Sequence, residues 1–328
     1  MGESLVLHAP AKINLGLALT GRYENGYHRL ETIFVPVTLF DKITVQRAAA
    51  DSVRYFWPHE ADADTQRMLA LGAAKNPLLH RALAALRQYI EVPPLSITVE
   101  KRIPSPGGLG GASADAAALI AGLWLQLAPT RAMPPKLIAA SEELGADIPF
   151  FLAHGLAGRA ARLSGIGHEL TAVKIPRLCG WLCVPAFGFP TAQMFAEVRQ
   201  WDLPPATSGS AEGMEKSHVN LALRLNEIPY SDEPIRGVRV LQNDFDRAAL
   251  AVFPAESRRL TRAKLTLAQA ARQFFPNEWV VGMTGSGAGL FAATEAGLPM
   301  RSLTALKPLL QTRLGRGWQV FPFTNIGP

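Results

Sequence analysis

The chain has 328 residues, which is enough for one large domain or two domains of ordinary size. Hydrophobic residues make up 48% of the sequence and charged residues 18%, a balance that excludes a disordered chain and a coiled coil. The net charge of +6 arises from 33 basic and 27 acidic residues that are scattered without a basic run. This charge suits an anionic small molecule and does not favour nucleic acid, which requires a clustered basic patch.

The sequence contains no pattern that predicts secretion, a membrane span or a disulfide framework. Glu3 comes early, and Pro10 and Lys12 interrupt the first apolar run, so a signal peptide is not expected. The longer uncharged stretches are short or broken by Gly or Pro. Cys179 and Cys183 lie four residues apart in an apolar stretch and are interpreted as buried, reduced thiols. We therefore expect a soluble, cytoplasmic protein.

The first half of the sequence predicts a strand pair, then helices around one further strand. A turn over 21–26 separates the first two strands, and the segment 48–76 is polar and irregular. The predicted strands cover residues up to 20, 32–45 and 95–101, and the predicted helices cover 77–90, 113–127 and 136–144.

The second half restarts with a strand near Trp181 and predicts an α+β protein in two parts. The composition of residues 207–217 is typical of a flexible loop. A helix is expected over 255–275, and strands are expected over 279–283 and 290–293. The change of pattern between 160 and 175 predicts two domains, residues 1–168 and 169–328.

A glycine-rich loop at 107–111 between a strand and a helix is the strongest physical signal for a ligand site. Glycines let the backbone approach a ligand, and the helix that follows offers free N–H groups and the positive end of its dipole to an anion. The loop is not a Walker A motif, because no Gly-Lys-Ser/Thr follows. The alternative is a tight packing turn between strand and helix.

Several polar residues near these elements have both a structural and a functional interpretation. Ser113 and Asp115 open the predicted helix and are either N-caps or, beside a phosphate, a hint of Mg²⁺. Asp147 precedes Ile148-Pro149 and either caps a turn or projects into a cleft. Lys12 lies inside an apolar run, where it either snorkels to solvent or serves a buried site, and Asn14 shares its face.

Two further glycine-containing turns carry weaker signals. Tyr27 and His28 follow Asn25-Gly26, where a hairpin tip would present them, although a histidine at a turn is usually only solvated. The cluster Gly285–Gly289 is compatible with a bulged hairpin.

Taken in order, these segments resemble the three motifs of the GHMP kinase superfamily: an N-terminal strand with a lysine, a glycine loop and a late glycine-rich turn. The first segment narrows the resemblance to the 4-diphosphocytidyl-2-C-methyl-D-erythritol kinase family. The matching segments are PAKINL at 10–15, GYHRL at 26–30, GADIPFF at 145–151, QNDF at 242–245 and TGSGAG at 284–289.

The resemblance implies a two-domain GHMP kinase fold with the active site in the cleft between the domains. It implies transfer of the ATP γ-phosphate, with Mg²⁺, to the 2-hydroxyl of the cytidylyl methylerythritol in the non-mevalonate isoprenoid pathway. Asp147 would be the general base, Lys12 would keep it ionised and oriented, and Asn14 would hydrogen-bond the erythritol hydroxyls. Neither nucleic acid nor a membrane is expected as a partner, and the chain would act as a monomer or homodimer.

The resemblance also assigns the two ligand-binding surfaces. The ATP phosphates would be held by the loop residues Pro104, Gly107, Gly108, Leu109, Gly110, Gly111, Ala112 and Ser113. Tyr27, His28 and Phe195 would hold cytosine, and Gly285 would complete the substrate-binding set.

Two positions depart from the loop that is usual in the family. Ala112 replaces a glycine and Ala114 replaces a second serine, so Ser113 is the only hydroxyl in the loop and the metal ligands are unknown. Two alternatives remain. The first is a related kinase that acts on homoserine or mevalonate, and the second is a nucleotide-binding protein without catalytic activity. The first would not need the Gly-Tyr-His turn, and the second should have lost Lys12 or Asp147.

Overall fold

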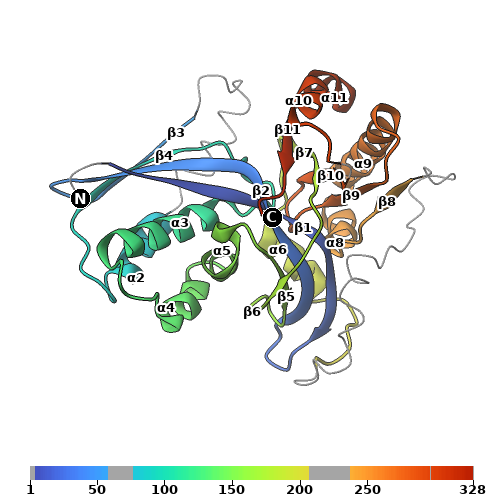
Figure 1. Ribbon diagram of the computed structural model, residues 1–328. Coiled ribbons are helices and arrows are strands. Elements are labelled where there is room, and N and C mark those ends of the chain that lie inside the picture. Colours follow the sequence, from blue (N-terminus) through green and yellow to red (C-terminus); the bar gives the residue numbers. More distant parts are fainter. Residues whose placement is uncertain (1–3, 58–76, 207–236, 296, 328) are drawn as a thin grey trace.

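The structure is a computed structural model that describes residues 4–57, 77–206, 237–295 and 297–327. Within these residues the chain forms a six-stranded and a five-stranded sheet. Helices cover one face of each sheet, and the two sheets lie side by side (Figure 1). This mixture of two sheets and separate helices confirms the α+β prediction.

The first sheet is built on a long hairpin. Its strands are β1 (Leu5–Arg22), β2 (His28–Arg47), β3 (Ser52–Phe56), β4 (Leu95–Glu100), β5 (Ala160–Ser164) and β6 (Glu169–Val173). They are ordered β3-β4-β2-β5-β6, with β1 paired to β2. The helices of this half are α2 (Leu78–Leu86), α3 (Gly111–Leu127), α4 (Pro135–Ala140) and α5 (Ile148–Ala153), with short 3₁₀ turns at Ser141–Glu143 and Gly155–Ala157. Buried aliphatic residues of α2 and α3 pack on β2 and β4 and form the first core.

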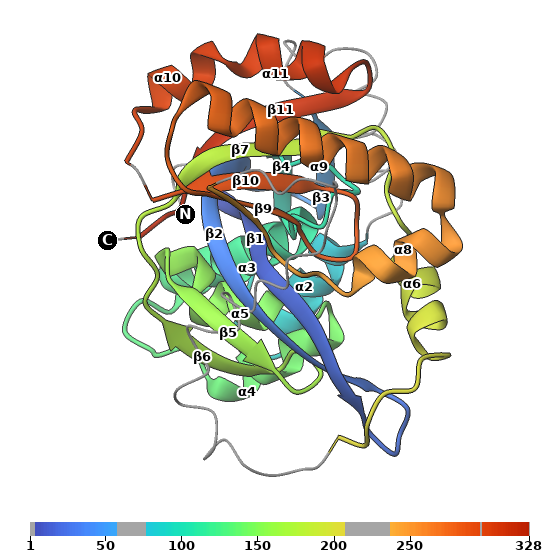
Figure 2. The ribbon, with the colours of Figure 1, turned by 90° about the vertical axis from the view of Figure 1, so that its right-hand side faces the viewer.

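The second sheet has the order β11-β7-β10-β9-β8. Its strands are β7 (Cys179–Pro185), β8 (Val238–Val240), β9 (Trp279–Met283), β10 (Leu290–Thr294) and β11 (Trp318–Thr324). Its helices are α6 (Thr191–Val198), α8 (Phe245–Val252), α9 (Pro254–Phe274), α10 (Met300–Ala305) and α11 (Lys307–Leu314). Figure 2 shows α9, α10 and α11 over one face of this sheet. The rings of Trp181 and Trp279 stack at 5.2 Å in its core.

The hairpin of β1 and β2 joins the two halves. The amide of Leu17 on β1 donates to the carbonyl of Gln242, and the amide of Asp244 donates back to Leu17. A third cluster of buried residues, which includes Ile13 of β1 and Phe291 of β10, fills the space between the sheets. The central part of β1 is therefore enclosed by both halves of the molecule.

Most predicted elements are confirmed, with three differences. Residues 52–56, predicted as irregular, form β3, a short parallel partner of β4. Helix α2 ends at Leu86, before the predicted end at Ile90, and the helix predicted over 136–144 is α4 followed by a 3₁₀ turn. The loop predicted over 207–217 lies outside the described residues. The chain passes from the first sheet to the second between Val173 and Cys179, and the domain division at 168/169 stays a prediction.

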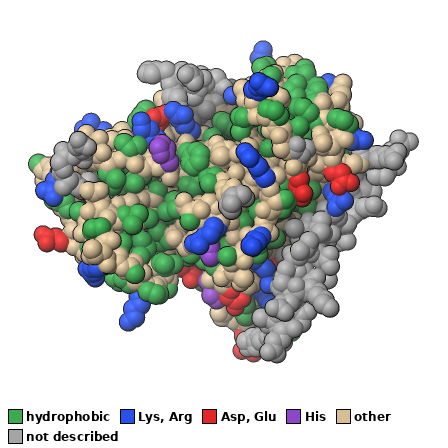
Figure 3. Space-filling view, viewed as in Figure 1, with side chains coloured by type: hydrophobic (Ala, Val, Ile, Leu, Met, Phe, Trp, Pro, Cys, Tyr) green, Lys and Arg blue, Asp and Glu red, His purple; other side chains and the backbone are tan. Residues whose placement is uncertain are grey.

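The surface and the thiols agree with the sequence. Figure 3 shows Lys and Arg side chains spread over the visible face rather than gathered in one patch. Cys179 and Cys183 are buried and unbonded to each other, as predicted. No helix in the described part of the chain is long and apolar enough to cross a membrane.

Candidate active site

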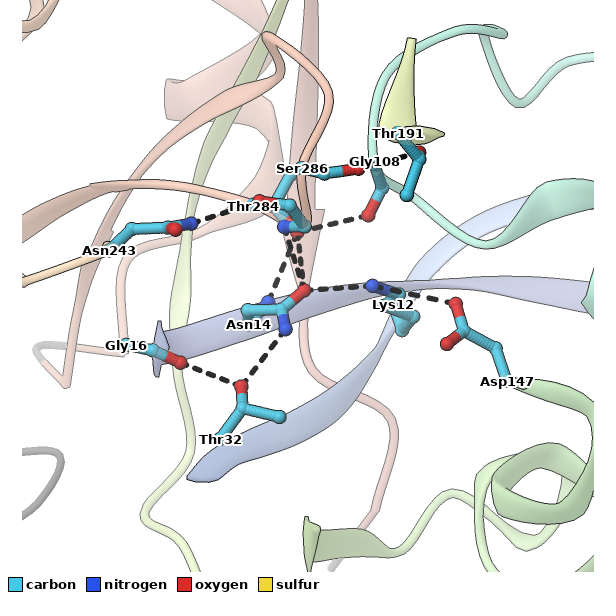
Figure 4. A network of polar contacts seen from close by, with 11 residues as sticks. Lys12, Asn14, Gly16, Thr32, Gly108, Asp147, Thr191, Asn243, Thr284 and Ser286 are labelled. Carbon is cyan, nitrogen blue, oxygen red and sulfur yellow. Dashed lines mark hydrogen bonds and ion pairs between the residues drawn. The ribbon is translucent and has the colours of Figure 1, made fainter. Parts of the chain in front are cut away.

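Lys12 lies near the middle of β1, where both halves of the molecule surround it. Its side chain is 4% exposed, so the interpretation as a snorkelling lysine is wrong. The Nζ atom lies 3.6 Å from Oδ2 of Asp147 and 4.2 Å from the ring centre of Phe34 (Figure 4). Burial lowers the pKa of Lys12, and the attraction of Asp147 opposes that shift. The lysine is a buried cation with one carboxylate as its ionic partner.

Asp147 stands at the N-cap position of α5, but its side chain makes no capping hydrogen bond. Pro149 follows within the first turn of the helix, where a missing N–H costs nothing. The carboxylate faces Lys12 and is 28% exposed, so one side of it remains open to a ligand. The arrangement puts a potential proton acceptor at the surface with a buried cation behind it.

Asn14 lies two residues from Lys12 on β1 and is 1% exposed. Its Oδ1 accepts hydrogen bonds from Nζ of Lys12 at 2.8 Å and from the amide of Gly285 at 2.9 Å. Its Nδ2 donates to Oγ1 of Thr32, which in turn donates to the carbonyl of Gly16 (Figure 4). The structure therefore brings Lys12, Asn14 and Gly285 together, and it occupies the oxygen of Asn14 with protein donors.

Thr284 connects the second glycine turn to the first loop, and Asn243 holds that turn; neither residue was predicted to have a role. Oγ1 of Thr284 lies 3.1 Å from Oδ1 of Asn14 and 3.2 Å from the carbonyl oxygen of Gly108. Nδ2 of Asn243 donates to the carbonyls of Met283 and Gly285, at 3.0 Å each. Both residues lie in segments that match the family, 242–245 and 284–289, and this match was the signal that could have indicated a role for them.

The glycines of the first loop are required by close packing. A Cβ atom at Gly108 would lie 2.0 Å from the carbonyl oxygen of Thr284, and one at Gly110 would lie 3.1 Å from Cγ of Lys12. Both residues have positive φ angles, +68° and +71°, which favour glycine. The interpretation of the loop as a tight packing turn is therefore correct for Gly108 and Gly110, where a side chain would not fit. It leaves the backbone amides of the loop available to an anion.

The loop leads directly into the N-terminus of α3. Gly110 is the N-cap, and the first amide with a helical partner is that of Ala114, which donates to Gly110. The amides of residues 111–113 precede it, as in helix N-termini that bind phosphate. Of the predicted loop residues, Pro104, Gly107 and Leu109 are buried, whereas Gly108, Gly110, Gly111, Ala112 and Ser113 are half-buried.

Asp115 does not cap α3, so its interpretation as an N-cap is wrong, and its carboxylate is bound to a lysine instead of being free for a metal ion. Its Oδ2 accepts from Nζ of Lys101 at 2.8 Å, and the same Nζ also bonds to Asp41. Asp41 in turn accepts the amides of Arg102 and Ile103, at 2.5 and 2.9 Å. Burial raises the pKa of Asp115 against the attraction of Lys101. Asp41, Lys101 and Asp115 thus form a buried group of three charges between β2, β4 and α3. The lysine offsets the repulsion between the two buried carboxylates.

The donor atoms do not form a ready-made cation site. Among the described residues, no group of three or more His, Cys, Asp and Glu side chains is placed to hold a metal ion. Asp115 is committed to Lys101, and Asp147 faces Lys12. Mg²⁺ usually takes one or two carboxylates together with phosphate oxygens, so these residues alone do not fit a resident Mg²⁺.

His28 and Phe195 come together from different halves of the chain. Their rings stack at 5.9 Å with an interplanar angle of 25°. His28 is 6% exposed, and its Nε2 is buried with no hydrogen-bond partner among the described residues. Tyr27, at the hairpin tip, is 60% exposed. The structure thus pairs two of the three predicted aromatic residues and leaves the third open to solvent.

Comparison with known proteins supports the resemblance found in the sequence. Residues 77–155 match the family model described as the GHMP kinases N terminal domain. The chain is similar to a 4-diphosphocytidyl-2-C-methyl-D-erythritol kinase of Cereibacter sphaeroides, with 31% identity over 97% of this chain and 98% of that protein. A kinase of the same description from Mycolicibacterium gilvum is 34% identical over 80% of this chain and 76% of that protein.

Solved structures give the same result for the fold. A crystal structure of 4-(cytidine 5'-diphospho)-2C-methyl-D-erythritol kinase covers 98% of this chain and is itself covered in full, with a TM-score of 0.63 and 26% identity. A mevalonate kinase structure, at 12% identity and a TM-score of 0.56 over 99% of this chain and all of that one, shares the fold alone. Because the sequence likeness to the Cereibacter protein extends over nearly the whole of both chains, this chain belongs to the 4-diphosphocytidyl-2-C-methyl-D-erythritol kinase family of the GHMP kinases.

Proposed function

We propose that the protein transfers the γ-phosphate of ATP to the 2-hydroxyl group of 4-diphosphocytidyl-2-C-methyl-D-erythritol, the compound for which its relatives are named as kinases. The hydroxyl oxygen forms a bond to the γ-phosphorus while the bond from that phosphorus to the β,γ-bridging oxygen breaks. The hydroxyl proton passes to Asp147, and ADP leaves with the bridging oxygen. The product is the 2-phosphate, an intermediate for isoprenoid precursors.

The observation that carries this proposal is the pair of Lys12 and Asp147 beside the glycine loop. The carboxylate is open on one side, and the lysine behind it is buried and 3.6 Å away. A cation at this distance favours the ionised carboxylate, which is the form that accepts a proton. The amide of Lys12 donates to the carbonyl of Leu109 in the loop at 2.9 Å, so the proposed base and phosphate site lie next to each other.

The nucleotide would be bound by backbone atoms. We assign the ATP phosphates to the amides of residues 108–113 and to the hydroxyl of Ser113, at the positive end of α3. Mg²⁺ would enter with ATP, bound to the phosphate oxygens, since Asp115 faces Lys101 instead. It would neutralise charge on the phosphates, and the protein would orient them.

The cytidylyl substrate would be bound by the two chain segments that carry aromatic residues. We assign cytosine to Tyr27, His28 and Phe195, because base stacking on aromatic rings is favourable and Nε2 of His28 is unpaired among the described residues. Asn14 would direct its remaining Nδ2 hydrogen to the erythritol, beside the amide of Gly285.

An ATP-consumption assay with purified protein tests this function. We expect ADP release only with the cytidylyl substrate and Mg²⁺, and little with homoserine or mevalonate. Equal or faster turnover of homoserine or mevalonate would identify a different kinase of the superfamily. ATP binding without transfer to any of the three substrates would favour an idle nucleotide-binding protein.

We expect Gly110→Ala to reduce turnover about tenfold, because its Cβ would lie 3.1 Å from Lys12 and would displace that side chain. The positive φ angle adds a cost of about 1–2 kcal/mol in stability. Gly297→Ala is the matched control: its φ is +60° and no atom lies within 4 Å of the new Cβ. The two melting temperatures should fall similarly while only Gly110→Ala loses turnover. Equal turnover in both variants would contradict the proposal.

We expect Tyr27→Ala and Phe195→Ala each to raise the KM for the cytidylyl substrate about ten- to a hundredfold, because stacking contributes about 1–3 kcal/mol per base. The KM for ATP should change little. His28→Ala should reduce the preference for cytosine over uracil in the substrate. Phe321→Ala, a partly buried aromatic on the edge strand β11, is the control and should leave both KM values unchanged. A rise in the KM for ATP instead would place these residues on the adenine side.

We further propose a cytoplasmic enzyme that acts as a monomer or homodimer on its two small-molecule substrates. Gel filtration with light scattering at micromolar concentration would measure the oligomeric state.

A further inference from the structure

Arg22, the last residue of β1, binds the C-terminal end of α6. Its Nη2 lies 3.3 Å from the carbonyl oxygens of Val198 and Trp201 and also donates to the carbonyl of Arg199. Two of these carbonyls also accept a backbone amide, Val198 from Trp201 and Trp201 from Leu203. All three lie at or just after the C-terminus of α6, where the negative end of the helix dipole attracts a cation. A single side chain therefore attaches the helix to the end of the hairpin.

The backbone makes a separate connection at the same place. The amide of Arg22 donates to the carbonyl of Pro204, and the amide of Ala206 donates back to Arg22, at 2.9 and 2.8 Å. Because these bonds involve only backbone atoms, a substitution of the Arg22 side chain leaves them in place. The guanidinium is therefore not needed to keep the chain after α6 against the hairpin.

Arg22 connects the two elements that carry the stacked rings of His28 and Phe195. Arg22 pairs directly with His28 in the register of β1 and β2, so both side chains project from the same face of the hairpin. Phe195 lies on α6, one turn before Val198, and its ring also contacts Phe245 edge-to-face at 5.0 Å. The hairpin thus supplies His28, the helix supplies Phe195, and Arg22 joins the two elements.

The other end of α6 is attached to the second glycine turn. The hydroxyls of Thr191 and Ser286 lie 2.7 Å apart (Figure 4). With one contact at each end, the helix has little freedom to slide along its axis. The exposed Thr191 contact is the weaker of the two, because the Arg22 contact is made by a charged donor to several carbonyls.

The electrostatics of His28 reflect the same arrangement. Burial lowers the pKa of His28, and the positive charges of Arg22 and Arg199 lower it further. A neutral imidazole retains one acceptor nitrogen and one donor nitrogen, which a cationic ring does not.

We propose that Arg22 is a positioning residue that sets the spacing between His28 and Phe195, and thereby the affinity for the cytidylyl substrate, through its hydrogen bonds to the C-terminal carbonyls of α6. This inference rests on the proposed function for its kinetic part. The spacing itself is a property of the protein and is measurable without substrate.

The test compares Arg22→Met, Arg22→Lys and Arg247→Gln. Methionine keeps the length and apolar character of the stem and removes the donors, whereas lysine keeps a charged donor without the planar fork. Arg247→Gln removes a cation from the same neighbourhood, where Arg247 lies 4.3 Å from the ring centre of Trp201. For each variant the KM for the cytidylyl substrate, the KM for ATP, kcat and the melting temperature are measured.

We expect Arg22→Met to raise the KM for the cytidylyl substrate about tenfold and Arg22→Lys about threefold. The KM for ATP and kcat should stay within about twofold, and Arg247→Gln should match the unmodified protein. If both Arg22 variants bind the cytidylyl substrate normally, or weaken ATP to the same degree, the proposal is wrong. If Arg22→Met does not fold, the Arg22→Lys variant gives the same comparison.

Proton NMR of the histidine rings separates this inference from the proposed function. The Hε1 signal of His28 is assigned by its absence in His28→Gln, and Phe195→Ala reports the shift caused by the stacked ring. In Arg22→Met this ring shift should decrease and the pKa of His28 should rise, because a neighbouring positive charge is lost. An unchanged ring shift overturns the positioning role, whether or not the protein phosphorylates the cytidylyl substrate. Absence of that phosphorylation in the unmodified protein overturns the proposed function alone.

Discussion

Replacement of Asp147 by asparagine should lower kcat about 10²–10⁴-fold and leave both KM values nearly unchanged. The amide keeps the shape of the carboxylate and its place at the start of α5, but it cannot accept the hydroxyl proton. Steady-state kinetics with both substrates varied measures the effect. Nearly normal turnover would exclude Asp147 as the base.

Lys12→Met separates a joint action of the two residues from independent actions. The side chains lie 3.6 Å apart, and Lys12 acts on the reaction only through Asp147 in the proposed mechanism. The double variant Lys12→Met/Asp147→Asn should therefore be little slower than the slower single variant. Multiplication of the two single losses would show that Lys12 contacts the phosphate or the substrate independently. Melting temperatures of all three variants control for loss of fold.

Lys101→Met should destabilise the protein by about 3–5 kcal/mol, because it leaves two buried carboxylates without their cation. Asp41 is fully buried and Asp115 is 2% exposed, so water cannot replace the ammonium group. Burial lowers the pKa of Lys101, but the attraction of Asp115 and Asp41 outweighs burial and raises it overall. The free energy of unfolding in urea, followed by tryptophan fluorescence, measures the loss.

Arg239→Met is the matched control for Lys101→Met. Arg239 and Glu278 form an ion pair at 3.2 Å whose side chains are 45% and 78% exposed. Exposed pairs contribute only about 0–1 kcal/mol, so the control should unfold almost as the unmodified protein does. A similar, small loss in both variants would mean that the buried group contributes no more than a surface pair.

Local patterns predicted the longer elements and gave no prediction for several short ones, such as β5, β6, α10 and α11. Strict alternation over 95–101 and the apolar periodicity of 255–275 predicted β4 and α9 to within about one residue, because each element buries one continuous face. The irregular prediction for 48–76 failed at β3, whose five residues acquire their conformation by pairing with β4. Such a short strand is stabilised by its neighbour rather than by its own sequence.

The candidate site was predictable as a set of residues but not as a set of contacts. The order of the motifs pointed to Lys12 and Asp147, and the family resemblance added Phe195. Asp115 pairs with Lys101 and is therefore neither a capping nor a metal-binding residue. This pair joins the end of β4 to α3, so it forms only when the helix packs on the sheet. The contact of Asn14 with Gly285 depends on the tertiary fold, and the spacing of motifs in a single sequence does not predict it.

The hydrogen bond between Asn14 and Gly285 spans 271 positions of the chain. A ribosome that adds about 5–20 residues per second needs roughly 15–55 s to synthesise that interval. During this time Asn14 has Thr32 as a partner but lacks the hydroxyl of Thr284 and the amide of Gly285. Asn14 on β1 therefore leaves the ribosome long before the glycine turn between β9 and β10 that completes its hydrogen bonds. Conditions that slow translation should lower the yield of active protein more than conditions that slow refolding of the finished chain.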